Sequence, residues 1–432
     1  MPKPARDILD ACAKILARYP LCDRCLGRQF HLLDEEEDNQ VVGSSLKRAL
    51  YLEHSAQLHA GKLKSMKVLK HLASSGHRPS AISLRTRTGK DVEAEPCPIC
   101  GGTLFEKVGE LASRAKAELS NVQYRTFQLG SKIPRKTVRA DDEIKMTYQL
   151  SHGENVKTEF NRLVAREFSR LARKVPVYSG EPDVSIIVNP TDGSVEVSPS
   201  PVYISGRYRK VKAGISQTRR RGANPLKSIE GMLADVFVRA LKAADVKFHG
   251  AGREDVDALM LGKGRPFILE VDRPTRRRIN LARVQRRFNS KFGRSVQVRG
   301  LRQASRSDVV RLKMGGERFD KRYRVILRVE QMPTEEKLRE VEIMATDLVI
   351  DQRTPKRVAW RRADKVRRRR IRSLKLRKID DKRLEAIVET QAGTYVKEFV
   401  TGDEGRTKPS LAELLNTATS WEALEVIQIL GG

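Results

Sequence analysis

The sequence lacks any apolar run near the ~20 residues that a membrane-spanning helix requires, and no signal peptide is apparent at its start. We therefore expect a cytoplasmic protein with no membrane partner. Cysteine is also scarce, with five residues in 432. So few thiols in a cytoplasmic chain argue against a disulfide framework. Because four of them form two close pairs, they favour a metal site instead.

Acidic residues are outnumbered, since 54 Asp and Glu stand against 85 Lys and Arg, for a net charge of +31. Such an excess is typical of a protein that binds a polyanion, and nucleic acid is the commonest one. We expect three domains, at residues 1–103, 104–225 and 226–432. No coiled-coil or self-complementary apolar stripe is apparent, so we expect a monomer without an obligate protein partner.

Two C-x-x-C pairs provide the candidate metal ligands. Cys22 and Cys25 lie in LCDRCLG, and Cys97 and Cys100 lie in EPCPICGG. Cysteines spaced in this way, with glycine or proline beside them, form tetrahedral sites for structural zinc. The alternative is two unrelated pairs of reduced thiols, because the pairs lie far apart in the sequence. Four protein ligands leave no open position, so we expect this zinc to hold structure rather than to perform chemistry.

Apolar periodicity predicts the main helices and strands. Apolar residues recur at helical spacing near residues 8–19, 106–120, 155–173, 228–243 and 281–292. Apolar and β-branched residues in runs or in alternation predict strands at 184–188, 195–197, 201–205, 267–271 and 323–329.

A basic stretch, GRYRKVKAGISQTRRRG at 206–222, follows the strand expected at 201–205. Its cationic residues, Arg207 among them, suit phosphates, and Tyr208 offers a flat face for bases or riboses. We interpret the stretch as an RNA contact. A solvated basic face without a partner is the alternative.

The stretch FHGAGREDVDALMLGKGRPFILEV, residues 248–271, is the candidate active site. Gly250 and Gly252 open a loop, and Gly262 and Gly264 close it before a strand. Three acidic residues and two arginines accompany the glycines: Glu254, Asp255, Asp257, Arg253 and Arg265. A carboxylate flanked by arginine keeps its charge and is directed at whatever binds, and Arg253 is itself a candidate contact for that ligand. A salt-bridged surface turn is the alternative interpretation.

Four strings together resemble the archaeal and eukaryotic tRNA pseudouridine synthases of the PsuX or Pus-ten class: FHGAGREDVDALMLGKGRPF, RYRV, DQRTPKRVAWRRAD and TQAGTYVKEFVTGDEGRTKPSL. The resemblance covers nearly the whole chain. LCDRCLGRQF and CPICGG are similar to that family's zinc-binding front end, and GRYRKVKAGISQTR is similar to its THUMP-containing segment. An archaeal-type enzyme is implied.

The resemblance implies an α/β (α+β) chain. The C-terminal part would have the pseudouridine-synthase fold, with a mixed, largely antiparallel sheet and a central RNA cleft. The N-terminal part would be a zinc-binding accessory domain with a THUMP-like unit. The implied activity is the isomerisation of uridine to pseudouridine in the T-arm of tRNA, at position 55 and in archaeal members also at position 54, without a catalytic cofactor.

The resemblance also implies roles for single residues. The catalytic aspartate of the family's G-R-E-D motif corresponds to Asp255, which Lys397 would keep ionised. The tyrosine that stacks on the target base and serves in proton removal corresponds to Tyr323. Val396 and Lys397 match an aliphatic residue followed by a basic one, and Leu424 matches a further pocket residue. Whether Asp255 attacks the sugar or takes a sugar proton stays open.

Two other classes of protein fit parts of the pattern. Charge and cysteine pairs alone permit a non-catalytic, zinc-containing RNA-binding or ribosome-assembly protein, for which Asp255→Asn would leave function untouched. The acidic residues alone permit a metal-dependent nuclease or phosphotransferase. That enzyme would lose activity in a chelator and would cleave RNA, whereas an isomerase leaves the length and mass of the RNA unchanged.

Overall fold

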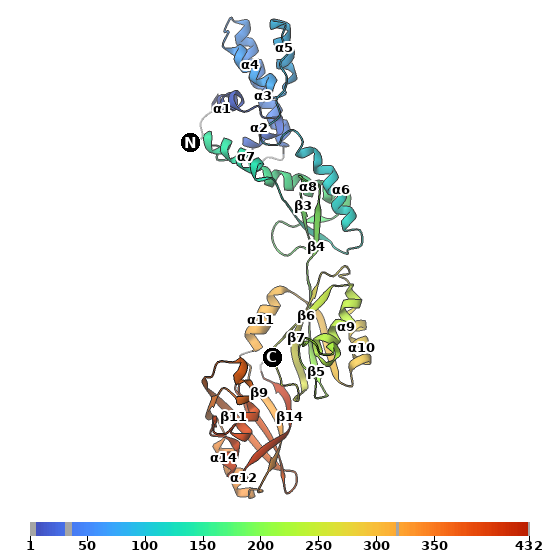
Figure 1. Cartoon of the computed structure of the whole chain (residues 1–432), viewed down its shortest axis with the longest axis vertical. Helices are drawn as coiled ribbons and strands as arrows, with labels where there is room; N and C mark the ends of the chain where they lie inside the picture. The colour runs from blue at the N-terminus through green and yellow to red at the C-terminus, as the bar shows by residue number, and fades with distance from the viewer. Residues whose placement is uncertain (1–5, 31–36, 317–318, 431–432) are drawn as a thin grey trace. The chain divides into compact units, whose positions relative to one another are not determined.

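The computed structural model describes residues 6–30, 37–316 and 319–430, in two compact units that divide between Pro199 and Ser200 (Figure 1). No described helix combines the length and the apolar character that a membrane crossing requires.

The first unit joins a helical front to a small mixed sheet. In this sheet the strand order is β2-β1-β3-β4. Strand β1 pairs in parallel with β2 and β3, and β3 pairs antiparallel with β4. The elements are α1 Arg6–Arg18, α2 Asp23–Gln29, α3 Asn39–His59, α4 Ser65–Ser74, α5 Arg78–Thr88, η1 Phe105–Lys107, α6 Val108–Glu118, β1 Thr126–Ser131, α7 Arg135–Thr147, α8 Val156–Ala172, β2 Val175–Pro176, β3 Val184–Val188 and β4 Val195–Pro199.

Helix α8 shows why these residues fold as they do. The side chain of Asn155 accepts a hydrogen bond from the backbone N–H of Lys157 and so caps the helix. Phe160 and Phe168 lie on its apolar face and are fully buried. Phe168 meets Phe127 of β1 edge to face, with ring centroids 4.7 Å apart. The helix predicted at 155–173 and the strand predicted at 184–188 are confirmed.

The second unit is built on one large mixed sheet. The order of its described strands is β13-β10-β11-β12-β9-β14-β7-β5-β8, and β6 also pairs with β7. Every pairing is antiparallel except that of β14 with β7. The mixed, largely antiparallel sheet is therefore confirmed. The elements are β5 Val202–Lys210, η2 Pro225–Lys227, α9 Ile229–Leu241, β6 Asp245–Gly250, β7 Leu259–Asp272, α10 Leu281–Phe292, β8 Val296–Ala304, α11 Arg306–Gly316, β9 Lys321–Val329, α12 Glu335–Met344, β10 Leu348–Arg353, η3 Lys356–Arg361, β11 Val366–Lys378, β12 Arg383–Thr390, α13 Val396–Thr401, β13 Thr407–Lys408, α14 Leu411–Leu415 and β14 Thr419–Ile429.

The parallel pair of β14 and β7 is a seam between two hydrophobic cores. One core lies among β5 to β8, α9 and α10, and the other among β9 to β12, α12, α13 and α14. The strands approach closely at the seam, because a Cβ added to Gly262 would lie 1.9 Å from the carbonyl oxygen of Ile427. Gly262 also has a φ of +53°, so only glycine fits there without strain.

Strand β5 extends to Lys210, beyond the strand expected at 201–205, and pairs with β7 and β8. Residues 200–225 therefore belong to the second unit, whereas the sequence placed that boundary at 225. The loop expected to end at Gly262 and Gly264 is shorter than predicted, because both glycines lie inside β7. The boundary expected at residue 103 stays a prediction.

Helix α10 covers the outer edge of β8 with side-chain amides. Asn289 donates from Nδ2 to the carbonyl of Val298 and accepts at Oδ1 from the N–H of Val298, both at 2.8 Å. Gln285 accepts at Oε1 from the N–H of Leu301 at 3.4 Å. These amides give the last strand of the sheet hydrogen-bond partners where no further strand follows.

Candidate active site and metal centre

The candidate loop, residues 251–258, connects β6 to β7 directly before the seam. Strand β7 begins at Leu259, and its first residues pair with Glu425 and Val426 of β14. Val426 pairs in turn with Tyr323 of β9. The seam therefore brings the loop and the predicted stacking tyrosine to neighbouring strands.

Glu254 anchors the loop to the interior. Its side chain is 2% exposed, and it accepts from Nε of Arg265 at 2.7 Å and from the hydroxyl of Tyr208 at 2.8 Å. Gln217 donates to the Tyr208 hydroxyl and to the carbonyl of Gly252. Burial raises the pKa of Tyr208 well above its usual value. Tyr208 is fully buried, so the contact with RNA predicted for it is wrong as the structure stands, and its role is to hold the loop.

Lys210 anchors the same loop through its backbone. Its buried ammonium donates to the carbonyls of Ile215, Asp255 and Val256, at 3.1, 2.8 and 3.1 Å. Burial lowers the pKa of Lys210. Three carbonyl acceptors compensate a charge that would otherwise be costly to bury. The backbone beside Asp255 is thus held from within the sheet.

Asp255 and Asp257 project from this anchored loop toward two cations. Arg357 lies 3.0 Å from Oδ1 of Asp255, and Lys397 lies 3.5 Å from its Oδ2. Lys397 is closer to Asp257, at 2.7 Å from each carboxylate oxygen, and its ammonium lies 3.9 Å from the centre of the Trp421 ring. The pairing that the sequence predicted for Lys397 is therefore shared between two aspartates, and Asp257 holds the larger part.

The charges around these aspartates differ in burial. The side chain of Lys397 is 8% exposed, whereas those of Asp255 and Asp257 are 33% and 51% exposed. Partial burial raises the pKa of Asp257, but the hydrogen bond and the charge of Lys397 outweigh this and hold the pKa below its usual value. Arg357 also bonds Glu398 at 2.6 Å. Sequence reasoning missed Arg357, because nothing distinguishes it within a long basic run.

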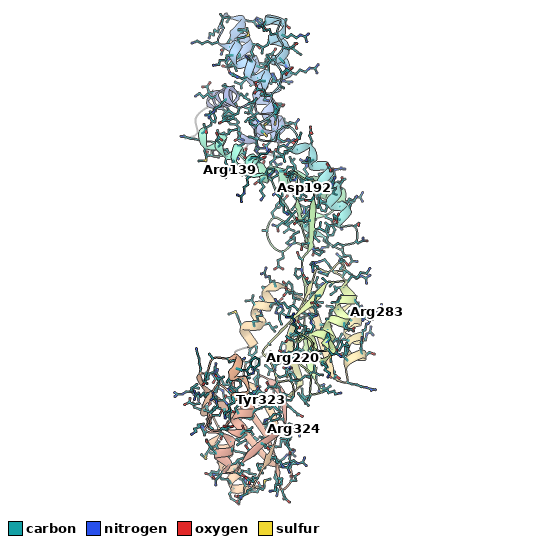
Figure 2. All side chains as sticks on the ribbon, viewed as in Figure 1. Arg139, Asp192, Arg220, Arg283, Tyr323 and Arg324 are labelled. Carbon is teal, nitrogen blue, oxygen red and sulfur yellow. The ribbon has the colours of Figure 1, made fainter. Side chains whose placement is uncertain are left out.

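Tyr323, which is labelled in Figure 2, lies on β9. It is half-buried and packs against both cores. Burial raises the pKa of Tyr323 to about 12, against the opposing influence of Arg265, and the charge of Asp255 adds to the rise. The phenol is therefore protonated at neutral pH. Two residues earlier, burial lowers the pKa of Lys321 to about 8, and its ammonium donates to the carbonyl of Phe319.

The remaining predicted residues lie in three settings. Val396 and Leu424 are buried in the core of β9 to β12, and their side chains pack against other apolar residues there. Arg253 is exposed on the loop, and the described residues give it no hydrogen bond or ion pair. Arg207 is half-buried on β5 and donates from Nε to the carbonyl of Lys263 at 3.0 Å.

The acidic residues do not converge on a common point. Glu254 turns inward to Arg265, while Asp255 faces Arg357 and Lys397, and Asp257 faces Lys397. Within the described ranges, these carboxylates form no group that could hold a metal ion. The metal-dependent nuclease considered from the sequence therefore loses its ligand set.

The cysteine pairs do converge, in the first unit. The sulfurs of Cys22, Cys25, Cys97 and Cys100 all lie within 4.8 Å of one another. Cys22 and Cys100 are 3.6 Å apart. A tetrahedral ion with metal–sulfur bonds of ~2.3 Å separates its ligand sulfurs by ~3.8 Å. The four-cysteine site predicted from the sequence is thus confirmed as a cluster able to bind a metal ion.

Comparison with known proteins adds the family context. A family model described as "Pus10, C-terminal" matches residues 203–430, and one described as "Pus10 THUMP domain, archaeal" matches residues 111–189. A relative from Thermofilum pendens, named tRNA pseudouridine synthase Pus10, is 36% identical over 98% of this chain and 95% of its own length. One of the same name from Methanopyrus kandleri is 38% identical over 98% of both chains. A solved Cbf5–Nop10–Gar1 complex overlaps 52% of this chain and 58% of its own, at 15% identity and a TM-score of 0.27.

Proposed function

The chain belongs to the Pus10 family of tRNA pseudouridine synthases, and on that premise we propose that Asp255 starts the isomerisation of T-arm uridines at position 55 and also at position 54. The observation that carries the proposal is the setting of Asp255. Its backbone is fixed by Lys210, while its carboxylate is partly exposed between Arg357 and Lys397. Such a group is held in place and is accessible to a substrate.

The reaction suits a single carboxylate. The bond between the ribose carbon and uracil N1 breaks, the uracil turns, and the ribose carbon joins uracil C5. The proton on C5 then leaves, and N1 gains a proton. Asp255 can begin this sequence by attacking the sugar or by removing a sugar proton. The atoms balance without water or a redox partner, so no catalytic cofactor is part of the proposal.

The neighbours of Asp255 have positioning roles. Lys397 and Arg357 place positive charge on both sides of the carboxylate and hold it in position. Tyr323 offers a ring on the adjoining strand for the uracil to stack on. Because its hydroxyl is protonated at neutral pH, Tyr323 can carry the C5 proton only as a relay and not as a free phenolate.

The substrate must be delivered to this site as a flipped nucleotide. Unstacking costs a few kcal/mol, which contacts to the RNA backbone have to offset. The net charge of +31 supplies such contacts. Binding should therefore weaken steeply with salt. The central RNA cleft, the monomeric state and the cytoplasmic location stay predictions.

We infer that the ion of the four-cysteine cluster is Zn²⁺. Thiolates at this separation suit a tetrahedral ion, and zinc is the usual ion for such a set. The ion would join the turn around Cys97 to helix α2, which contains Cys25. It would stabilise the first unit and take no part in the isomerisation.

One assay tests the proposal. Unmodified tRNA transcript is incubated with the protein in chelator, and pseudouridine is mapped by chemical labelling. Asp255→Asn should lower the rate at least about a thousandfold, with an unchanged melting temperature. The matched control, Asp272→Asn, removes an exposed carboxylate at the far end of β7 and should react normally.

The rivals give different results in the same assay. A wild-type protein that forms no pseudouridine would favour a non-catalytic RNA-binding protein. Shortened RNA would indicate a nuclease. Transcripts with cytidine at position 54 or 55 report each target separately. Because chelation can unfold the four-cysteine unit, circular dichroism is recorded on the same sample.

A further inference from the structure

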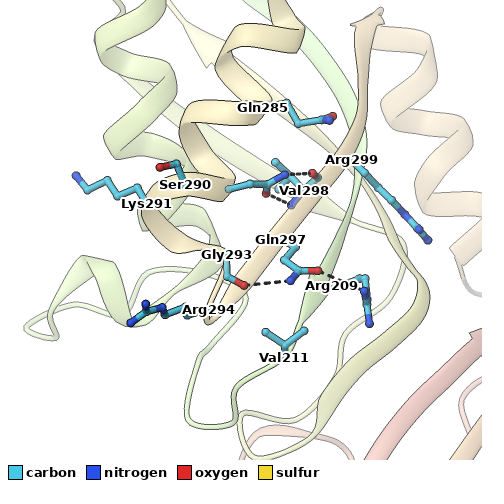
Figure 3. Close-up of a pocket in the computed structure, with 11 residues that line it drawn as sticks. Arg209, Val211, Gln285, Ser290, Lys291, Gly293, Arg294, Gln297, Val298 and Arg299 are labelled. Atoms are coloured by element: carbon cyan, nitrogen blue, oxygen red, sulfur yellow. Dashed lines mark hydrogen bonds between the residues drawn. The ribbon is translucent and has the colours of Figure 1, made fainter.

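At the β8 end of the sheet, residues of strands β5 and β8 and of helix α10 line an open pocket of about 1050 Å³ (Figure 3). Four of its lining side chains are cationic and none is acidic: Arg209, Lys291, Arg294 and Arg299. Of these, Lys291 pairs with Asp235 of α9 at 2.7 Å. Figure 3 shows Lys291 and Arg294 on one side and Arg209 and Arg299 on the other. Strand β8 lies two strands beyond the seam strand β7, so this pocket is separate from the Asp255 loop.

The arginines of this pocket differ from those in the other half of the sheet. On β9, Arg324 bonds Glu385 and Glu425 of its neighbouring strands, and Arg322 bonds Glu389. On β5 and β8, within the described chain, no arginine pairs with a carboxylate. Cross-strand acids thus pair with these arginines of β9, whereas the arginines of β5 and β8 have no carboxylate partner among the described residues.

Two observations show that the positive charges on β5 and β8 are incompletely compensated by neighbouring groups. Arg207 lies directly across from Arg299, a like-charge pair that destabilises adjacent strands. Burial and the charge of Arg299 lower the pKa of Arg207. Nε of Arg209 is buried without a hydrogen-bond partner, although its Nη1 donates to Gln297 at 3.3 Å. An anion in the pocket would relieve both.

We propose that this pocket binds the phosphodiester backbone of the tRNA, away from the uridine that is isomerised. The inference rests on the proposed function, since it names a second contact for the same substrate. A single small anion cannot neutralise cations on both sides of an open pocket, whereas successive phosphates of one strand can. Ser290 and the amide nitrogen of Gln285 add polar groups suited to phosphate or ribose oxygens, whereas the amide of Asn289 is engaged with Val298.

The position of the pocket ties backbone binding to the catalytic loop. Arg209 lines the pocket, and the next residue on β5, Lys210, donates to the carbonyl of Asp255. Side chains alternate along a strand, so β5 presents one cation to the pocket and the next to the loop. RNA bound at Arg209 is therefore held by the same strand, β5, whose next residue fixes the backbone of Asp255.

The test reverses two exposed charges of the pocket. Arg294 has no ion pair with a described residue, and Arg299 makes one bond to the Gly262 carbonyl, so Arg294→Glu/Arg299→Glu should fold normally. The control, Arg328→Glu/Arg339→Glu, makes the same change of charge on β9 and α12, where Arg328 is exposed and lies 3.9 Å from Glu422. We expect the pocket variant to bind unmodified tRNA at least about tenfold more weakly and to lower the slope of log K against log salt by about two.

Equal weakening in the pocket variant and the control would overturn the proposal, because net charge alone would then explain it. Unchanged tRNA binding would overturn it as well. So would a pocket variant that loses saturable binding of inorganic phosphate but keeps its affinity for tRNA.

The same data separate this proposal from the catalytic one. Affinity for tRNA is measured by filter binding, with no need for turnover. If Asp255→Asn keeps its activity while the pocket variant binds weakly, the catalytic assignment fails and the pocket stands. If Asp255→Asn is inactive and the pocket variant binds tRNA like wild type, the opposite holds.

Discussion

Two clusters of charged side chains, one in each unit, each join a cation to two carboxylates and differ in exposure. In the first unit, Arg28 lies 3.0 Å from Asp141 and 2.7 Å from Glu159, and all three side chains are 0% exposed. In the second unit, the buried ammonium of Lys397 faces two aspartates that are partly open to solvent.

The exposure of the carboxylates decides whether a ligand can reach such a cluster. Where cation and carboxylates are all enclosed, no ligand reaches them, and their contribution is to structure. Where the cation is buried and the carboxylates are open, the cation directs the acidic groups toward whatever enters. The kind of charge alone does not separate these cases, because both clusters contain two carboxylates and a cation.

The largest effect on stability is expected from breaking the enclosed cluster. Arg28→Ala removes the shared cation and leaves Asp141 with Lys145 and Glu159 with Arg24. It should lower the free energy of unfolding by about 3 kcal/mol, the low end of the range for breaking a buried ion pair. Denaturant titration of the full chain measures the loss.

Arg170→Ala, which removes an exposed partner of Glu167, is the control and should leave the free energy of unfolding close to that of wild type. A loss from Arg28→Ala no larger than that of the control would remove the distinction.

A buried cation without a carboxylate partner gives an intermediate effect. The pKa of Lys321 is lowered to about 8 by burial, so the unfolded chain binds its proton more tightly than the folded one. Lys321→Met should therefore stabilise the protein by about 2–3 kcal/mol at pH 7. The gain should fall as pH rises from 8 toward 10.5, where the folded lysine has already lost its charge.

Melting temperatures of both proteins at pH 7 and pH 10 measure this change. A gain of equal size at both pH values would trace it to packing and not to charge.

The smallest effect is expected in the open cluster. Asp257→Asn removes a half-exposed partner of Lys397 and should cost under about 1 kcal/mol. The depressed pKa of Asp257 means that its contribution is present above about pH 4 and disappears as pH falls through its folded value. Melting curves recorded at pH 7 and at pH 3 follow this change.

With Asp257→Asn, Lys397 is free to pair with Asp255 alone, so the rate on tRNA should change only a few-fold. A thousandfold loss of activity would instead assign the chemistry to Asp257.

Much of the scaffold could be predicted from the sequence, because its periodicities are strong. The helix expected at 281–292 is α10, and the strand at 184–188 is β3. The resemblance to a known family named Asp255, Lys397 and Tyr323, which the seam brings to adjoining elements. Their assigned roles stay predictions until the variants are measured.

The errors have a common physical cause. Tyr208 and Lys210 lie in a basic stretch that looks like a surface, yet both are buried because the loop after β6 supplies the acceptors that they need. Arg357 bonds Asp255, about a hundred residues earlier in the chain. The residues around Arg357 in its basic run do not indicate which carboxylate it contacts. Partners distant in sequence decide whether a polar residue is structural or functional.

The amides that helix α10 contributes to the last strand of the sheet have a consequence for assembly. A terminal strand with free N–H and C=O groups is a template on which a second chain can polymerise. Asn289 and Gln285 already occupy these groups at Val298 and Leu301. At Val298 and at the Leu301 N–H the border therefore has no free group for strand addition between copies, and the positive surface beside it can meet a nucleic acid.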